Sequence, residues 1–99
     1  MSKCKITVLR RTEYKDLMDL YENPLEDACC MKIGDEFLVS SIDKPEGFCN
    51  VAWDILTPFI EELLNGGGCF YGNWMKNPKS ALISCNDGFR PVSYLIELI

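Results

Sequence analysis

The amino-acid sequence predicts one small α+β domain in which two helices pack on one face of a mostly antiparallel sheet. The chain has 99 residues, close to the commonest size of a single domain. Its 47% hydrophobic and 25% charged residues form an ordinary globular balance. Apolar residues follow strand and helix periodicities in the order β-α-β-α-β-β. No repeat, low-complexity tract or linker divides the chain, so we expect residues 1–99 to form a single domain.

The first half of the chain is expected to form a strand, a short helix and a second strand. Alternating apolar residues predict a strand from Cys4 to Leu9. Apolar residues spaced i, i+3, i+4 and i+7 from Tyr14 to Tyr21 predict a helix that Thr12 caps. Asn23-Pro24 ends this helix, because helical geometry is disfavoured for the residue before a proline. A segment rich in Phe, Val and Ile predicts the second strand, from Glu36 to Ile42.

The second half is expected to form the longest helix and two further strands. Apolar positions from Val51 to Leu64 share one helical face, with acidic residues opposite. Pro58 must kink this helix or split it, because proline has no backbone N–H to donate. The run Gly66-Gly67-Gly68 ends the helix and opens a loop. The third strand is expected at Ala81 to Cys85 and the fourth at Val92 to Leu98.

The charge balance narrows the classes of partner. Fifteen acidic residues against ten Lys and Arg give a formal charge of −5. Such a surface repels nucleic-acid phosphates and anionic membranes, so neither is an expected partner. No apolar run approaches the roughly 20 residues that cross a bilayer, and the N-terminus shows no signal-peptide pattern. We therefore expect a cytoplasmic protein whose six cysteines are thiols, metal ligands or redox groups rather than disulfides.

Histidine is absent from the chain. Histidine is the commonest general base and the commonest metal ligand in proteins. Its absence excludes both a Cys-His nucleophilic pair and a Ser-His-Asp triad. Any catalytic proton transfer falls to a carboxylate, a lysine, a tyrosine or a thiol.

The cysteines are the leading candidates for chemistry. They form no C-x-x-C pair of the kind found in structural zinc sites and thioredoxin-like redox sites. Distant loops could still bring thiols together, and a sulfur-rich site suits zinc, copper(I) or an iron–sulfur centre. The alternative is packing as small hydrophobic side chains, the commoner role and the one expected of Cys4. Four cysteines lie beside Gly, Pro or Asp turns, where a thiol can be partly exposed: Cys30, Cys49, Cys69 and Cys85.

The segment from Asp87 to Pro91 is a second candidate site. Its Asp87 and Arg90, close to Cys85 in sequence, could hold an anion. Arg90 could also favour the thiolate form of Cys85. The alternative is an Asp-Gly turn in which Arg90 pairs with an acidic residue, and turn chemistry alone explains the motif.

Two aromatic residues after the glycine run are candidates for a binding surface. Trp74 and Phe70 are expected in a loop, where an aromatic side chain suits a pocket or a subunit contact. Trp53 lies beside the apolar stripe of the long predicted helix, so we expect it in the core.

Several motifs are shared with a known family. They are Pro45-Glu46-Gly47-Phe48-Cys49 followed by Trp53, and Cys85-x-Asp87-Gly88-x-Arg90-Pro91-Val92. With these motifs the chain resembles a family of small proteins of about this length, found largely in anaerobic bacteria and archaea. The resemblance extends over nearly the whole chain and implies no established activity. It selects Cys30, Cys49 and Cys85, which match the family pattern, whereas Cys4, Cys29 and Cys69 do not.

Two hypotheses place the function at the thiols. In the first, Cys30, Cys49 and Cys85 converge in a cytosolic accessory protein as a thiol cluster for a metal or redox cofactor, such as zinc or an iron–sulfur centre. In the second, the chain is a small histidine-free enzyme with one activated cysteine. Arg90 would then favour the thiolate and Asp87 would orient it.

A third hypothesis makes the chain a structural or interaction module. An exposed strand edge can pair with the sheet of another chain, which makes a homodimer the expected assembly. The predicted contacts are Trp74, Phe70 and the C-terminal strand that ends at Leu98 and Ile99.

Overall fold

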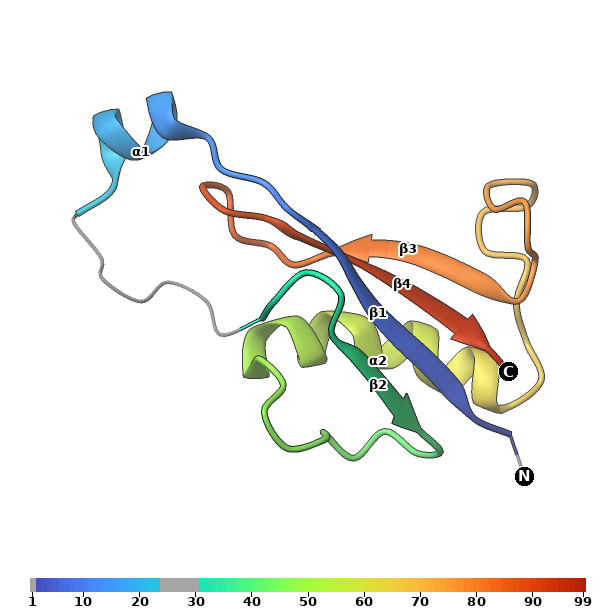
Figure 1. Cartoon of the computed structure of the whole chain (residues 1–99). Coiled ribbons are helices and arrows are strands. Elements are labelled where there is room, and N and C mark those ends of the chain that lie inside the picture. The colour runs from blue at the N-terminus through green and yellow to red at the C-terminus, as the bar shows by residue number, and fades with distance from the viewer. Residues whose placement is uncertain (1, 24–30) are drawn as a thin grey trace.

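The computed structural model describes residues 2–23 and 31–99. It shows a four-stranded antiparallel sheet and two helices, so the predicted α+β class and element order are confirmed (Figure 1). The elements are β1 (Cys4–Arg11), α1 (Lys15–Tyr21), β2 (Glu36–Val39), α2 (Asn50–Leu64), β3 (Ser80–Ser84) and β4 (Val92–Leu98). None of the helices within these residues has the length and apolar character that crossing a membrane requires.

The sheet has the strand order β2-β1-β4-β3. The first and last strands of the chain are therefore central neighbours, with Cys4 opposite Leu98 and Arg11 opposite Val92. A bulge at Leu9 shifts the register between β1 and β4. The expectation that the C-terminal strand offers a free edge is wrong, because β4 has β1 on one side and β3 on the other.

The core lies between one face of the sheet and α2, which crosses that face (Figure 1). Inward-facing residues of β1 and β4 alternate with exposed or half-buried ones, as the period of two predicts. Trp53 is buried, as expected, and its indole Nε1 donates a hydrogen bond of 2.9 Å to the Ile42 carbonyl. The apolar stripe of α2 consists of Ala52, Trp53, Leu56, Ile60 and Leu63.

Pro58 lies inside α2, which remains one helix through it. A non-proline residue at this position would donate its N–H to the Asp54 carbonyl. The Thr57 hydroxyl donates to that carbonyl instead, at 3.1 Å. Of the two predicted alternatives, a kink or a split, the split is therefore wrong, and a neighbouring side chain supplies the donor that proline lacks.

Several predicted boundaries differ from the structure, and those of β1 and β3 differ by one or two residues from the predicted ranges. β2 ends at Val39 rather than Ile42, and its last pairing with β1 joins Val39 to Cys4, near the start of β1. Thr12 does not cap α1, because Tyr14 occupies the N-cap position and makes no side-chain hydrogen bond there.

α1 does not pack on the sheet beside α2, which corrects the expectation of two helices on one face. It buries none of its residues and extends beyond the end of the sheet (Figure 1). Backbone hydrogen bonds of 2.9 Å from Thr12 to Pro91 and from Tyr14 to Phe89 hold the preceding segment against the β3–β4 loop. The chain is thus directed past the sheet before α1 begins.

Cys4 is fully buried at the start of β1, as expected of a small hydrophobic residue. Burial raises the pKa of its thiol above the ordinary 9.0, because the thiolate is poorly solvated there. The unfolded chain therefore loses this proton first as the pH rises. We expect Cys4 to contribute a fall in the free energy of unfolding above about pH 9 and none below it. Urea unfolding should show that the free energy of unfolding falls less between pH 8 and pH 10 for Cys4→Ala than for the wild-type chain. An equal fall in both proteins would contradict this.

Candidate functional site

The structure places two of the three selected cysteines at the edge of one core. Cys49 is the N-cap residue of α2 and Cys85 follows β3, and both are half-buried against the core cluster. The Cys85 sulfur accepts a hydrogen bond of 3.3 Å from the Val92 N–H. Cys30 lies outside the described residues. Within residues 2–23 and 31–99, no three metal-ligating side chains form a group that could hold an ion.

The four described thiols differ in exposure: Cys69 is exposed, Cys49 and Cys85 are half-buried, and Cys4 is buried. If none of these thiols is activated, the accessibility of each thiol determines how fast it is alkylated. We expect iodoacetamide at neutral pH to label Cys69 first and Cys4 last, as read by peptide mass spectrometry. Labelling of Cys85 or Cys49 ahead of Cys69 would instead favour the cysteine-enzyme hypothesis.

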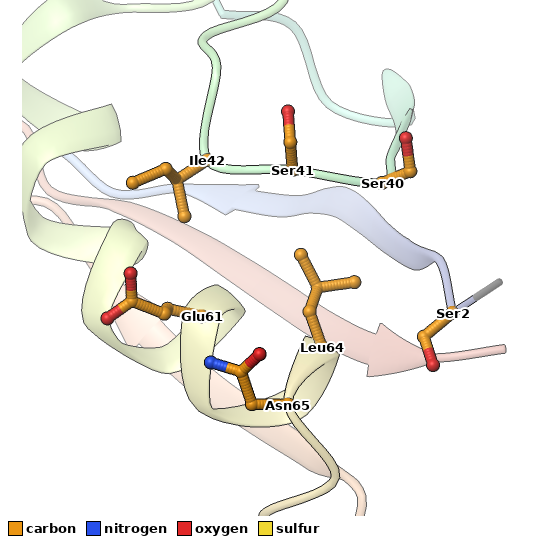
Figure 2. Close-up of a pocket in the computed structure, with 7 residues that line it drawn as sticks. All are labelled: Ser2, Ser40, Ser41, Ile42, Glu61, Leu64 and Asn65. Atoms are coloured by element: carbon orange, nitrogen blue, oxygen red, sulfur yellow. The ribbon is translucent and has the colours of Figure 1, made fainter.

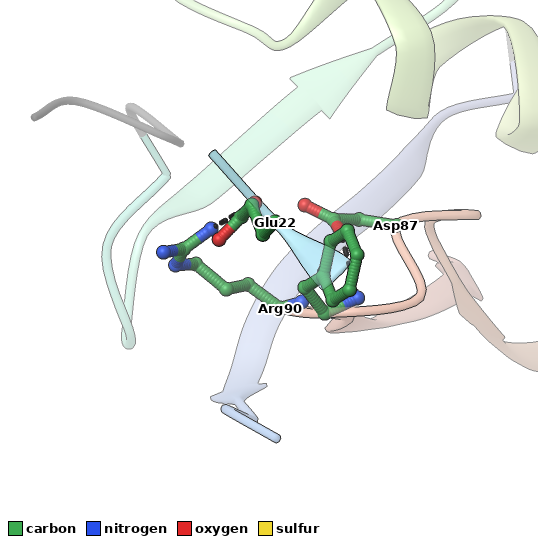
Figure 3. Close-up of polar contacts among 4 residues, drawn as sticks. Glu22, Asp87 and Arg90 are labelled. Carbon is green, nitrogen blue, oxygen red and sulfur yellow. Dashed lines mark hydrogen bonds and ion pairs between the residues drawn. The ribbon is translucent and has the colours of Figure 1, made fainter. Parts of the chain in front are cut away.

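The Asp87–Pro91 segment forms the Asp-Gly turn that turn chemistry predicts. The Asp87 carboxylate accepts hydrogen bonds from the N–H groups of Phe89 at 2.8 Å and Arg90 at 3.1 Å. The Arg90 guanidinium donates to the Glu22 carboxylate at 2.7 Å (Figure 3). This hydrogen bond raises the pKa of Arg90, so the guanidinium stays charged. These partners match the turn interpretation, and the part of the chain that the structure describes shows no contact supporting catalytic roles for Asp87 and Arg90.

The Arg90–Glu22 pair also attaches α1 to the β3–β4 loop. Glu22 follows the last residue of α1. Its side chain is only 12% exposed, and that of Arg90 is 16% exposed. Together with the two backbone bonds before α1, this contact holds both ends of the helix. The sequence pattern predicted the helix and an acidic partner for Arg90, but it carried no signal that the partner is Glu22.

The apolar side of α1 faces solvent. Leu20 and Tyr21 are 70% and 75% exposed, and no residue of the helix is buried. An isolated helix of seven residues is marginal in water, because helical stability in proteins comes mainly from packing an apolar face. Tyr14 and Leu17 continue the exposed apolar surface. This surface, formed by Tyr14, Leu17, Leu20 and Tyr21, is called the α1 surface below.

The sheet face opposite α2 carries a shallow groove near the α1 end of β1. It has a volume of about 270 Å³ and is lined by Leu9, Arg10, Leu82 and Ser93. Register places Arg10 of β1 opposite Ser93 of β4. Leu82 of β3 lies opposite Leu95 of β4 on the same face. This open-face groove therefore combines apolar side chains with one arginine.

A second cavity, of about 310 Å³, lies between the chain start, the segment after β2 and the end of α2 (Figure 2). Its polar residues are Ser2, Ser40, Ser41, Glu61 and Asn65, with Ile42 and Leu64 between them. Figure 2 shows the Ser40 and Ser41 hydroxyls directed away from Glu61 and Asn65. Because these groups do not converge, the cavity supports no specific ligand. No sequence motif had marked these residues.

The glycine run ends α2, as predicted. The Gly66 and Gly67 N–H groups donate to the Leu63 and Glu62 carbonyls, the bonds of a Schellman motif. The Lys79 ammonium donates to the Gly66 and Gly67 carbonyls at 2.8 and 2.6 Å, where the helix dipole favours a cation.

The loop after this motif carries the two predicted aromatic candidates. Phe70 is half-buried against Phe59, with ring centroids 5.1 Å apart, so it contributes to packing more than to an open surface. Trp74 is 43% exposed and meets Tyr71 edge to face at 5.2 Å. Trp74 therefore remains a surface residue, and the loop between α2 and β3 that carries it lies at the opposite end of the molecule from α1 (Figure 1).

Comparisons of the chain with protein-family models, curated proteins and solved structures find no significant match. The family resemblance of the cysteine and Arg-Pro motifs thus stays a prediction. Three features of the molecule bear on its function: the α1 surface, the open-face groove and the two half-buried thiols.

Proposed function

We propose that the protein is an interaction module that associates with a second copy of itself through the α1 surface. The observation that carries the proposal is the position of α1, which presents Leu20 and Tyr21 to solvent while both of its ends are attached to the β3–β4 loop. The expected homodimer therefore uses a contact different from the C-terminal strand suggested by the sequence.

The exposed side chains favour association. Burying a Leu-sized side chain stabilises a contact by roughly 1.5–3 kcal/mol relative to leaving it in water. The α1 surface holds two leucines and two tyrosines on one short helix and its N-cap residue. Tyrosine suits an interface because its ring buries apolar area while its hydroxyl stays hydrated.

The attachment of α1 lowers the entropic cost of association. A segment that orders only on binding loses conformational freedom at that step, whereas a preorganised segment has lost it already. The Arg90–Glu22 pair and the Tyr14–Phe89 backbone bond restrain the helix in the free chain. More of the burial energy then remains as binding energy.

Light scattering over a concentration series tests the proposal. We expect the mass to rise from 11.3 kDa toward twice that value, and Leu20→Asp to weaken the association at least about tenfold. Trp74→Ser is the matched control, because it removes an exposed aromatic group from the α2–β3 loop, which lies at the other end of the molecule. A mass of 11.3 kDa at every concentration would contradict the proposal.

A second candidate function is the thiol site for a metal or redox cofactor. It is favoured by the half-buried positions of Cys49 and Cys85 against one core cluster. Anaerobically purified protein should then contain zinc or iron by elemental analysis. Cys49→Ser and Cys85→Ser should lose it, whereas Cys69→Ser should retain it. A folded, metal-free protein with unreactive thiols would exclude this function.

A further inference from the structure

We infer that the α1 surface of each copy docks into the open-face groove of the other, in a reciprocal exchange. This inference rests on the proposed function and identifies the surface that receives α1. The dimer it describes has a two-fold axis, so each copy contributes one helix and one groove.

The groove has the chemistry to receive an apolar helix. Leu9 and Leu82 are 44% and 43% exposed on a sheet face that no described helix covers. The bulge at Leu9 opens the register next to Arg10, which increases the local twist of β1. Leucine side chains on two different strands thus flank a hollow at the end of the sheet.

Charge complementarity between the two surfaces favours this groove as the receiving site. The chain carries a formal charge of −5, so two copies repel one another unless a basic group faces an acidic one. Asp16, one turn before Leu20, borders the α1 surface, and Arg10 lines the groove. Neither side chain forms an ion pair or hydrogen bond with any residue in 2–23 or 31–99. Lys5, by contrast, already pairs with Glu36 at 3.7 Å.

A second copy is the occupant because α1 is already held against the β3–β4 loop of its own chain. The contacts of Thr12 with Pro91 and of Glu22 with Arg90 hold both ends of the helix against the β3–β4 loop. α1 nevertheless begins only four residues after β1 ends, so helix and groove are neighbours on the surface. A two-fold axis between them brings both exchanged contacts into one continuous interface.

The interface need not be large. A standard specific interface buries roughly 800 Å² per partner. That area is about an eighth of the 6522 Å² exposed by one copy. In the reciprocal dimer each helix–groove contact occurs twice. A substitution within the contact therefore changes the free energy of association twice over.

Charge reversal tests the exchange. We expect Arg10→Glu alone and Asp16→Arg alone to weaken dimerisation about tenfold each, because each creates two like-charged contacts per dimer. An equimolar mixture of the two variants should form a heterodimer close to wild-type affinity, since one contact is native and the other has both charges reversed. The matched controls are Lys76→Glu and Glu46→Arg, which change the net charge equally at exposed positions elsewhere.

Sedimentation equilibrium and circular dichroism of each variant give the affinities and confirm folding. The exchange is supported if the dimer affinity recovers in the mixture of the two variants. Neither variant alone and no mixture of the control variants should show this recovery. A mixture no stronger than its components would overturn the groove assignment, while dissociation by Leu20→Asp would still uphold the α1 surface. A monomeric wild-type chain would overturn both.

Discussion

Leu56→Ala should lower the free energy of unfolding by about 3 kcal/mol, within the roughly 2–5 kcal/mol range for buried leucines. Leu56 lies in the middle of α2 and is fully buried in the cluster that joins the helix to the sheet. Truncation removes apolar contacts and leaves a cavity that close-packed neighbours fill only in part.

The matched control for this prediction is Val51→Ala on the same helix. Val51 is 54% exposed, and alanine is the better helix former, so we expect a change below about 0.5 kcal/mol. Urea unfolding followed by circular dichroism measures both variants. Equal losses for the two would contradict the position of α2 on the sheet.

Gly68→Ala should destabilise the protein by about 2 kcal/mol or more. Gly68 has φ +148°, a region that side chains rarely enter, and an added Cβ would lie 2.6 Å from the Pro78 carbonyl oxygen. Pro78 cannot easily move away, because the same oxygen accepts a 2.7 Å hydrogen bond from the Cys69 N–H. The substitution would therefore open the loop that carries Tyr71 and Trp74.

Gly88→Ala provides the control at a second loop glycine. An added Cβ there meets nothing within 4 Å, and its backbone angle imposes no glycine requirement. We expect this variant to be neutral or slightly stabilised, since alanine restricts the unfolded chain. Thermal unfolding of both variants gives the comparison, and a Gly88→Ala loss as large as that of Gly68→Ala would refute the close approach to Pro78.

The spacing of apolar residues predicted the helices and strands that bury one face of regular periodicity. The alternation from Val92 to Leu98 gave the bounds of β4 as observed, because every second residue of that strand lies in the core. The stripe of α2 was predicted for the same reason, except that Val51, which was assigned to it, is 54% exposed, and Trp53 is in the core as expected. The Asp87 turn was predicted because its hydrogen bonds are local.

The remaining features depend on contacts between distant segments. The spacing from Tyr14 to Tyr21 shows which face of α1 is apolar, but not that this face is left uncovered. The pairing of Glu22 with Arg90 spans 68 positions and has no local signature. The strand order that encloses β4 is likewise a long-range property, and it removed the edge proposed for dimerisation.

The candidate site was only partly predictable for the same reason. Trp74 remains exposed, whereas Phe70 packs on Phe59, a contact set by the path of the loop. Cys49 and Cys85 both reach the edge of the core, although 36 positions separate them. The open-face groove arises from three strands and a bulge, so no single segment could reveal it.

Hydrogen exchange of the α1 amides at several protein concentrations tests the central claim that α1 is the association element. The Met18 and Glu22 N–H groups donate to the Tyr14 and Met18 carbonyls, and these bonds break when the helix frays. We predict that their exchange slows at least about tenfold between dilute and concentrated protein, while exchange in β4 changes far less. Exchange of the α1 amides at the same rate across all concentrations would contradict the account.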